Sequence, residues 1–123
     1  MAIKQDENGI IHLFSGDTGH ITINGLNPEI NYNCYLQFSD EDGNFVGSQI
    51  TSQSNYSSSV AFFVPTTVSD LLTVPAGEDY TTYYCGVKKA EVGSYDEDTI
   101  IPTYGGKKTV IVYRKVVEGP DNE

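Results

Sequence analysis

Polar and apolar residues alternate along much of this chain with the two-residue period of half-buried β-strands. In the clearest example Tyr83, Cys85 and Val87 share one face, while Tyr84 and Gly86 share the other. No stretch repeats apolar residues at helical spacing over three turns, so long helices are nearly excluded. Seven segments are predicted strands: 10–14, 19–25, 32–38, 45–51, 57–64, 80–88 and 108–117.

Turn residues separate these segments, as in the polar runs 15–19 and 40–44. Together the strands and turns predict an all-β fold. We expect a single immunoglobulin-like β-sandwich of about seven antiparallel strands over residues 1–123, with its core between about residues 10 and 117 and with polar tails. Segment 65–72 predicts one short helical turn, capped by Thr67 and Asp70, whose Leu71 and Leu72 would close the bottom of the core.

The faces of the predicted strands also predict which side chains are buried. Eleven residues form the expected core: Ile21, Ile23, Leu36, Phe38, Phe62, Val64, Tyr83, Cys85, Val87, Val110 and Val112. Immunoglobulin domains link two strands by a disulfide beside a Tyr-x-Cys strand, which makes a Cys34 to Cys85 bond conceivable. Because the chain contains no Trp and begins without the apolar core of a secretory signal, we expect two free, buried thiols in a reducing cytoplasm.

The net charge is −10, and no Lys or Arg lies between residues 5 and 87. A surface so poor in cations disfavours nucleic-acid binding, which depends on clustered Lys and Arg. The acidity either keeps the protein soluble by self-repulsion or docks it on a basic partner. No apolar run approaches the roughly 20 residues of a membrane span, so no membrane role is predicted.

Few residues suggest catalysis or metal binding. A metal pair of His12 and His20 would need a third ligand from elsewhere. The acidic runs 40–44 and 96–98 could hold calcium, but hairpin turns use the same residues for backbone reasons. We therefore predict no enzymatic activity, no catalytic residue, no bound metal and no cofactor.

Three tyrosines in predicted loops are candidate interface residues, namely Tyr56, Tyr95 and Tyr104. Their rings could stack on a sugar or on a protein partner. Segment 108–117 is apolar on both faces and is rich in cations, so its Ile111, Tyr113, Arg114 and Lys115 complete the candidate interface. We expect its outward face to be covered by a second copy, by another partner, or by the loop 91–106 of the same chain.

Over about residues 15–117 the chain resembles small β-sandwich proteins of tailed-bacteriophage virions, of the head-fibre, capsid-decoration and baseplate-adaptor kind. The resemblance depends on these motifs: Ser-Gly-Asp-Thr-Gly at 15–19 before Ile-Thr-Ile at 21–23, Tyr-Asn-Cys-Tyr-Leu at 32–36, Asp-Glu-Asp-Gly at 40–43, Leu-Thr-Val at 72–74, Tyr-Tyr-Cys-Gly-Val-Lys at 83–88, Asp-Thr-Ile-Ile-Pro at 98–102 and Val-Ile-Val-Tyr at 110–113.

The resemblance implies a non-enzymatic building block located in the virion and made in the cytoplasm of the bacterial host. Such a subunit docks on capsid or tail proteins, often in several copies. Fibre proteins of this kind usually continue into a long shaft, and this chain stops at residue 123, which favours a decoration, adaptor or fibre-base subunit. The alternative is a carbohydrate-binding β-sandwich module of a bacterial surface or secreted system, which the loop tyrosines suggest.

Overall fold

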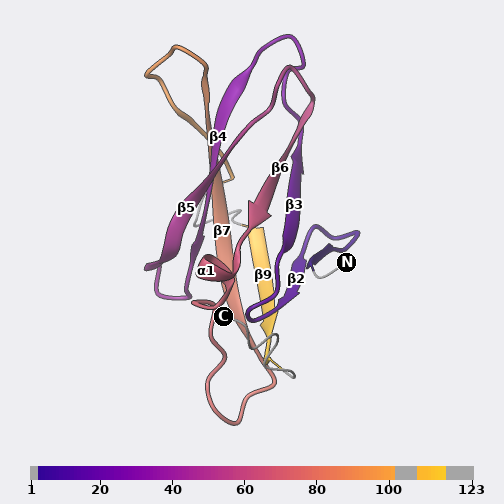
Figure 1. The fold of residues 1–123 in the computed structure, drawn as a ribbon, viewed down its shortest axis with the longest axis vertical. Helices are drawn as coiled ribbons and strands as arrows, with labels where there is room; N and C mark the ends of the chain where they lie inside the picture. The colour runs from indigo at the N-terminus through magenta and orange to yellow at the C-terminus, as the bar shows by residue number, and fades with distance from the viewer. Residues whose placement is uncertain (1–2, 102–107, 116–123) are drawn as a thin grey trace.

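The computed structural model describes residues 3–101 and 108–115. These residues form a mostly-β structure with one short helical turn (Figure 1). The larger sheet has the strand order β1-β2-β9-β7-β4-β5, and β8 pairs beside β7. Its strands are β1 (Ile3–Gln5), β2 (Ile11–Phe14), β4 (Tyr32–Ser39), β5 (Phe45–Gln53), β7 (Tyr80–Glu91), β8 (Asp98–Ile101) and β9 (Lys108–Tyr113).

The smaller sheet pairs β3 (Gly19–Asn24) with β6 (Ser59–Val64). Both sheets contribute side chains to one hydrophobic core, which extends from Ile3 in β1 to Val112 in β9. All eleven core residues predicted from the alternation are buried. That prediction is confirmed, and Ile3 adds a core position before residue 10 that the sequence pattern did not indicate.

The larger sheet is mixed, which corrects the expectation of antiparallel strands alone. β2 runs parallel to β9, with Ile11 opposite Val110 and Phe14 opposite Tyr113. The other pairs in this sheet are antiparallel. Two strands, β1 and β8, are additional to the seven predicted, because segments of three and four residues are too short to show a period. Predicted residues 116–117 of the last strand lie outside the described residues.

The helical turn α1 (Thr66–Ser69) lies inside the predicted segment, but its capping differs from the prediction. Pro65 is the N-cap residue, and no side chain caps the turn, so the predicted reciprocal pair of Thr67 and Asp70 is wrong. Leu72 is fully buried as expected, whereas Leu71 is 52% exposed. Adjacent residues of one turn point in different directions, so only one of the two leucines reaches the core.

Cys34 and Cys85 are free and buried, as predicted. They lie on neighbouring strands of one sheet, where Cys34 is opposite Lys89 and Cys85 is opposite Phe38. Four residues of antiparallel strand therefore separate the two thiols, about 14 Å along the strand. A disulfide needs Cα atoms within about 7 Å, so the geometry excludes the bond. No helix in the described part of the chain is long and apolar enough to cross a membrane.

Candidate functional site

Three loops gather at one end of the molecule, which we call the loop end: residues 25–31, 54–58 and 92–97 (Figure 1). Asn31 connects them. Its backbone carbonyl accepts a hydrogen bond from the N–H of Val92 at 3.0 Å, and its side-chain Oδ1 accepts one from the N–H of Asn55 at 2.8 Å. The N–H of Leu26 donates to the carbonyl of Ser58 at 2.9 Å. These bonds make the loop end one hydrogen-bonded unit rather than three separate loops.

Tyr56 has an unusual backbone at this end. Its φ is 59°, and the φ of the preceding Asn55 is 53°, so both residues adopt the left-handed conformation. Asn tolerates this region, whereas a bulky aromatic residue there is an outlier that costs about 1–2 kcal/mol. The ring gains little from burial in return, since Tyr56 is 65% exposed. The turn therefore holds an exposed aromatic ring in a strained position.

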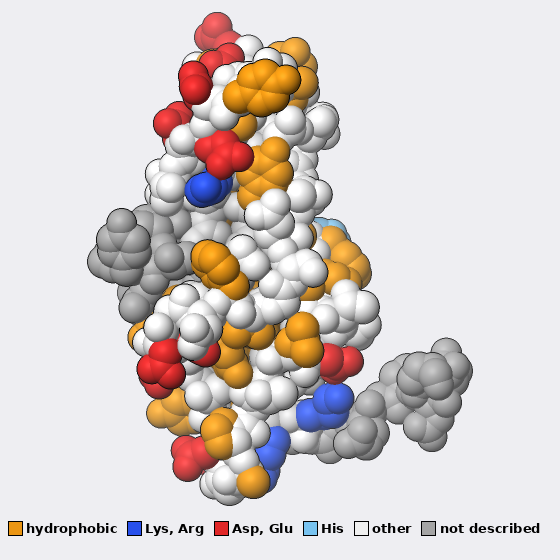
Figure 2. Space-filling model, turned by 90° about the vertical axis from the view of Figure 1, so that its left-hand side faces the viewer, with side chains coloured by type: hydrophobic (Ala, Val, Ile, Leu, Met, Phe, Trp, Pro, Cys, Tyr) orange, Lys and Arg blue, Asp and Glu red, His pale blue; other side chains and the backbone are white. Residues whose placement is uncertain are grey.

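Tyr95 is fully exposed at the tip of the loop between β7 and β8. Around it the loop end is acidic, because Glu91, Asp96 and Glu97 are also exposed. Figure 2 shows acidic side chains gathered toward this end of the molecule, close to hydrophobic ones. The structure thus brings two of the three predicted loop tyrosines to one end, and Tyr104 lies outside the described residues.

The predicted residues of β9 form a second candidate surface. Val110 and Val112 point into the core, while Ile111 and Tyr113 are half-buried on the opposite side of the strand. Tyr113 stands in register between Phe14 on β2 and Tyr80 on β7. The ring centroid of Tyr113 lies 5.3 Å from that of Phe14 and 6.4 Å from that of Tyr80. We call these three residues the aromatic row.

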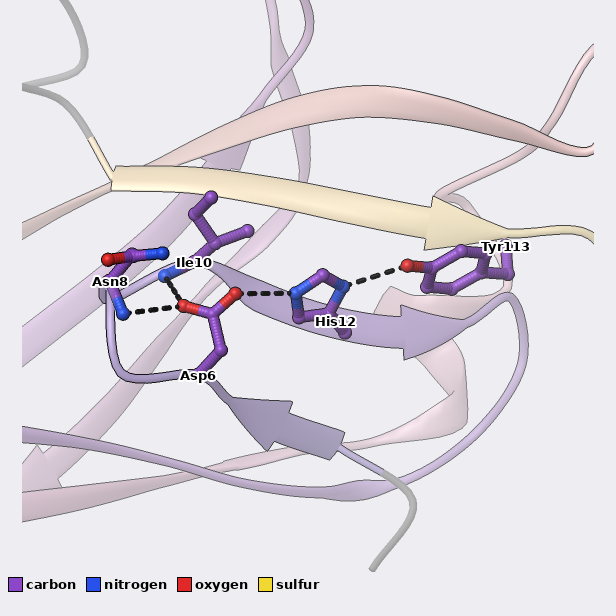
Figure 3. Close-up of polar contacts among 5 residues, drawn as sticks. All are labelled: Asp6, Asn8, Ile10, His12 and Tyr113. Atoms are coloured by element: carbon purple, nitrogen blue, oxygen red, sulfur yellow. Dashed lines mark hydrogen bonds and ion pairs between the residues drawn. The ribbon is translucent and has the colours of Figure 1, made fainter.

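The hydroxyl of Tyr113 belongs to a chain of hydrogen bonds (Figure 3). It lies 2.8 Å from Nδ1 of His12, and Nε2 of His12 lies 2.9 Å from Oδ2 of Asp6. The other oxygen of Asp6 accepts hydrogen bonds from the N–H groups of Asn8 and Ile10 at 2.9 and 3.0 Å. This chain joins the turn between β1 and β2 to both of the parallel strands.

The acidity of Asp6 fixes the direction of the bonds that Asp6 makes. Hydrogen bonds from His12 and from the N–H of Ile10 hold the pKa of the Asp6 carboxyl below its ordinary value. The ionised carboxylate can only accept, so Nε2–H of His12 donates to it. In the neutral imidazole Nδ1 is then the acceptor of the Tyr113 O–H. The chain therefore locks the orientation of the Tyr113 ring, which stacks on the imidazole at an interplanar angle of 16°.

The two cations that follow β9 form ion pairs within the chain. Arg114 lies 3.5 Å from Asp79, and Lys115 lies 3.4 Å from Asp70. Arg114 also donates its backbone N–H to the carbonyl of Asp79. These residues lie at the end of β9 beside the aromatic row. Their ion pairs connect β9 to the segment between α1 and β7. Both cations remain partly exposed, so their place in the candidate interface stays a prediction.

The metal sites weighed from the sequence do not form among the described residues, where no three His, Cys, Asp or Glu side chains converge. His12 lies in the larger sheet, whereas His20 lies in the smaller one against the ring of Phe63. In the run 40–44 the N–H of Asn44 is the main donor that lowers the pKa of Asp40. Asp40 therefore serves the hairpin turn, as the backbone reading of this run predicts.

The sequence did not indicate the hydrogen bonds of Asn31, Asp6 and His12. The bonds of Asn31 join segments more than 20 residues apart, and His12 and Tyr113 are separated by 101 positions. No local pattern carries that information. For the left-handed backbone of Tyr56 there was no signal either, because Tyr is not a residue that favours this conformation and the segment joins two strands that do not pair.

Fold and surfaces together define a mostly-β protein that presents a hydrogen-bonded loop end and an aromatic row on the outward side of its larger sheet. No protein-family model matches the chain, and none of the curated proteins matches it in sequence.

Proposed function

We propose that this chain is a non-enzymatic structural protein of a tailed-bacteriophage virion, with an immunoglobulin-like β-sandwich fold, that docks on capsid or tail proteins through its loop end. It would serve as a decoration, fibre-base or adaptor subunit. The proposal joins the resemblance in the sequence motifs to the geometry of the exposed tyrosines.

Strand order supports the immunoglobulin-like part of the proposal. In such domains one sheet contains the third, sixth and seventh strands side by side, and variable-type domains add a further strand beside the third. Here β4, β7 and β9 are adjacent in this way, and β5 extends the sheet beyond β4. The smaller sheet pairs β3 with β6, which matches the second and fifth strands of those domains.

Tyr83 gives a second, independent support for the same fold. Immunoglobulin-like domains have a tyrosine two residues before the cysteine of their sixth strand, whose hydroxyl bonds to the backbone upstream. Tyr83 precedes Cys85 by two positions, and its hydroxyl donates to the carbonyl of Thr73 at 2.6 Å. The absence of a cross-sheet disulfide is the main departure, because Cys34 lies on β4 rather than on β3.

The docking role is proposed mainly because Tyr56 has a strained backbone and an exposed ring. Residues held in costly backbone conformations cluster at binding sites, where the surrounding structure keeps them in position. Asn31 supplies that restraint by bonding to the neighbouring Asn55. A rigid, exposed tyrosine is also the kind of residue that provides binding energy at protein interfaces, since little side-chain entropy is lost when it is covered.

Purified virus particles test the proposal directly. We expect the chain to be present in fixed copy number, and we expect Tyr56→Ala and Tyr95→Ala together to lower its occupancy on particles. Phe63→Ala is the matched control, because it removes an exposed aromatic ring from β6, away from the loop end. Particles that lack the chain would refute the virion assignment, and equal occupancy of all variants would refute docking through the loop end.

A carbohydrate-binding module is the second candidate, favoured by the full exposure of Tyr95. Aromatic rings stack on sugars, and the loops that contain Tyr56 and Tyr95 lie at the same end of the molecule (Figure 1). A glycan array separates the candidates. Sugar binding that disappears in Tyr95→Ala would favour this function over virion docking, and an array without any binding would disfavour it.

A further inference from the structure

The sequence contains two Asn-Gly pairs, Asn8-Gly9 and Asn24-Gly25. In such a pair the main-chain nitrogen of the glycine can attack the side-chain amide carbon of the asparagine. Glycine hinders this attack least, because it has no side chain and a freely rotating backbone. Both asparagines are exposed to water. Local sequence therefore treats the two pairs alike, and a difference between them must come from the fold.

The turn between β1 and β2 restrains the first pair. The N–H of Gly9 donates to the carbonyl of Asp6 at 2.9 Å. The N–H of Asn8 donates to the carboxylate of Asp6, also at 2.9 Å (Figure 3). A β-carbon placed on Gly9 would lie only 3.2 Å from Nζ of Lys108, so the space beside this residue is filled. The nitrogen that would have to attack Asn8 is thus hydrogen-bonded and crowded.

The second pair has neither restraint. Asn24 is opposite Ser59 in the last pair of the β3–β6 ladder, and Gly25 lies beyond both strands. None of the described residues accepts a hydrogen bond from the N–H of Gly25. A β-carbon placed on Gly25 would meet no atom within 4 Å. The nitrogen that would attack Asn24 is therefore unbonded and open to water.

We propose that Asn24 is a site of spontaneous deamidation in the folded protein. The nitrogen of Gly25 forms a bond to Cγ of Asn24 and gives up its proton, and the side-chain nitrogen leaves as ammonia. Water then opens the resulting cyclic imide at either of its two carbonyl carbons, which leaves aspartate or isoaspartate at position 24. Either product adds one negative charge, and isoaspartate also adds one carbon atom to the main chain. The reaction needs no oxidant, reductant or enzyme.

The modification lies at the base of the loop end. Leu26 follows the pair directly, is buried, and donates its N–H to the carbonyl of Ser58 at 2.9 Å. An additional main-chain atom before Leu26 changes the spacing between the end of β3 and this hydrogen bond. Formation of isoaspartate therefore loosens the connection between the loops 25–31 and 54–58, the second of which contains Tyr56.

Incubation of the folded chain at mildly alkaline pH tests the proposal. Deamidation raises the mass by about 1 Da, and electron-based fragmentation in the mass spectrometer identifies the position and distinguishes isoaspartate from aspartate. Asn8 is the control within the same molecule, and the chain unfolded in urea is the control for local sequence. We expect Asn24 to react at least about tenfold faster than Asn8 in the folded chain, a ratio that corresponds to about 1.4 kcal/mol, the order of one hydrogen bond. In urea the two rates should be similar.

Equal or slower reaction at Asn24 in the folded chain would overturn the proposal, as would a ratio of rates that persists in urea. Hydrogen exchange at the amide of Leu26 measures the effect on the loop end. Exchange there should be faster after incubation of the wild-type chain, whereas Asn24→Gln incubated in the same way should keep its original rate. An unchanged rate in the wild-type chain that contains isoaspartate would refute the loosening of the loops. The test needs no virus particle, so its outcome is independent of the virion assignment.

Discussion

The left-handed backbone at Tyr56 makes an unusual prediction about stability. At most positions glycine is less stable than alanine, because glycine loses more backbone entropy on folding. At φ 59° the order should reverse, since alanine keeps the left-handed strain while glycine does not. The strain amounts to about 1–2 kcal/mol, and the entropy term to about 0.4–1 kcal/mol. Tyr56→Gly should therefore be more stable than Tyr56→Ala by about 1 kcal/mol.

Comparing the two variants with each other removes the contribution of the lost tyrosine ring, which is the same in both. The measurement is the urea concentration at the midpoint of unfolding for each variant. The difference between the midpoints is converted to a difference in the free energy of unfolding with one m-value for both variants. Ser58 in the same loop is the control, because its φ is not in the left-handed region, and there alanine should be the more stable. If Tyr56→Ala equals or exceeds Tyr56→Gly in stability, the strain at Tyr56 is absent and the argument for a pre-positioned ring fails.

Two further predictions concern the core. Tyr83→Phe should destabilise the fold by about 1 kcal/mol, because it removes only the hydroxyl that bonds to the loop before β7. An unchanged midpoint would mean that this bond contributes nothing to the fold. Burial raises the pKa of the Cys85 thiol to about 12, so alkylation at mildly alkaline pH should modify it only after unfolding. Rapid labelling of the native protein, or an intact mass about 2 Da below the reduced value, would contradict the free, buried thiol.

The buried faces of the strands could be predicted because alternation is a local property. Residues such as Cys34, Leu36 and Phe38 point inward because each is two positions from the next, whatever strand lies beside them. Which strands become neighbours in a sheet does not depend on local sequence. The parallel pairing of β2 with β9 was therefore not predicted. The antiparallel expectation followed from hairpin turns, which connect only strands that are adjacent in sequence.

The candidate sites were predicted less well for the same reason. Exposure of Tyr56 and Tyr95 follows from their polar loops, so those residues were recognised from composition. The hydrogen bonds that restrain these surfaces come from residues far away in the chain. Asn31 is 25 positions from Tyr56, and His12 is 101 positions from Tyr113. The charges of Arg114 and Lys115 were noticed, but their acidic partners lie in loops whose position the sequence does not specify.

Docking on a larger assembly places a physical requirement on the loop end. A ring that docks must be held in position, and Asn31 restrains the backbone beside Tyr56 in a strained conformation. The carbonyl of Asn31 also accepts a hydrogen bond from the N–H of Val92, in the loop that contains Tyr95. One residue therefore connects the two loops that present the exposed tyrosines, so the positions of both rings depend on the same restraint.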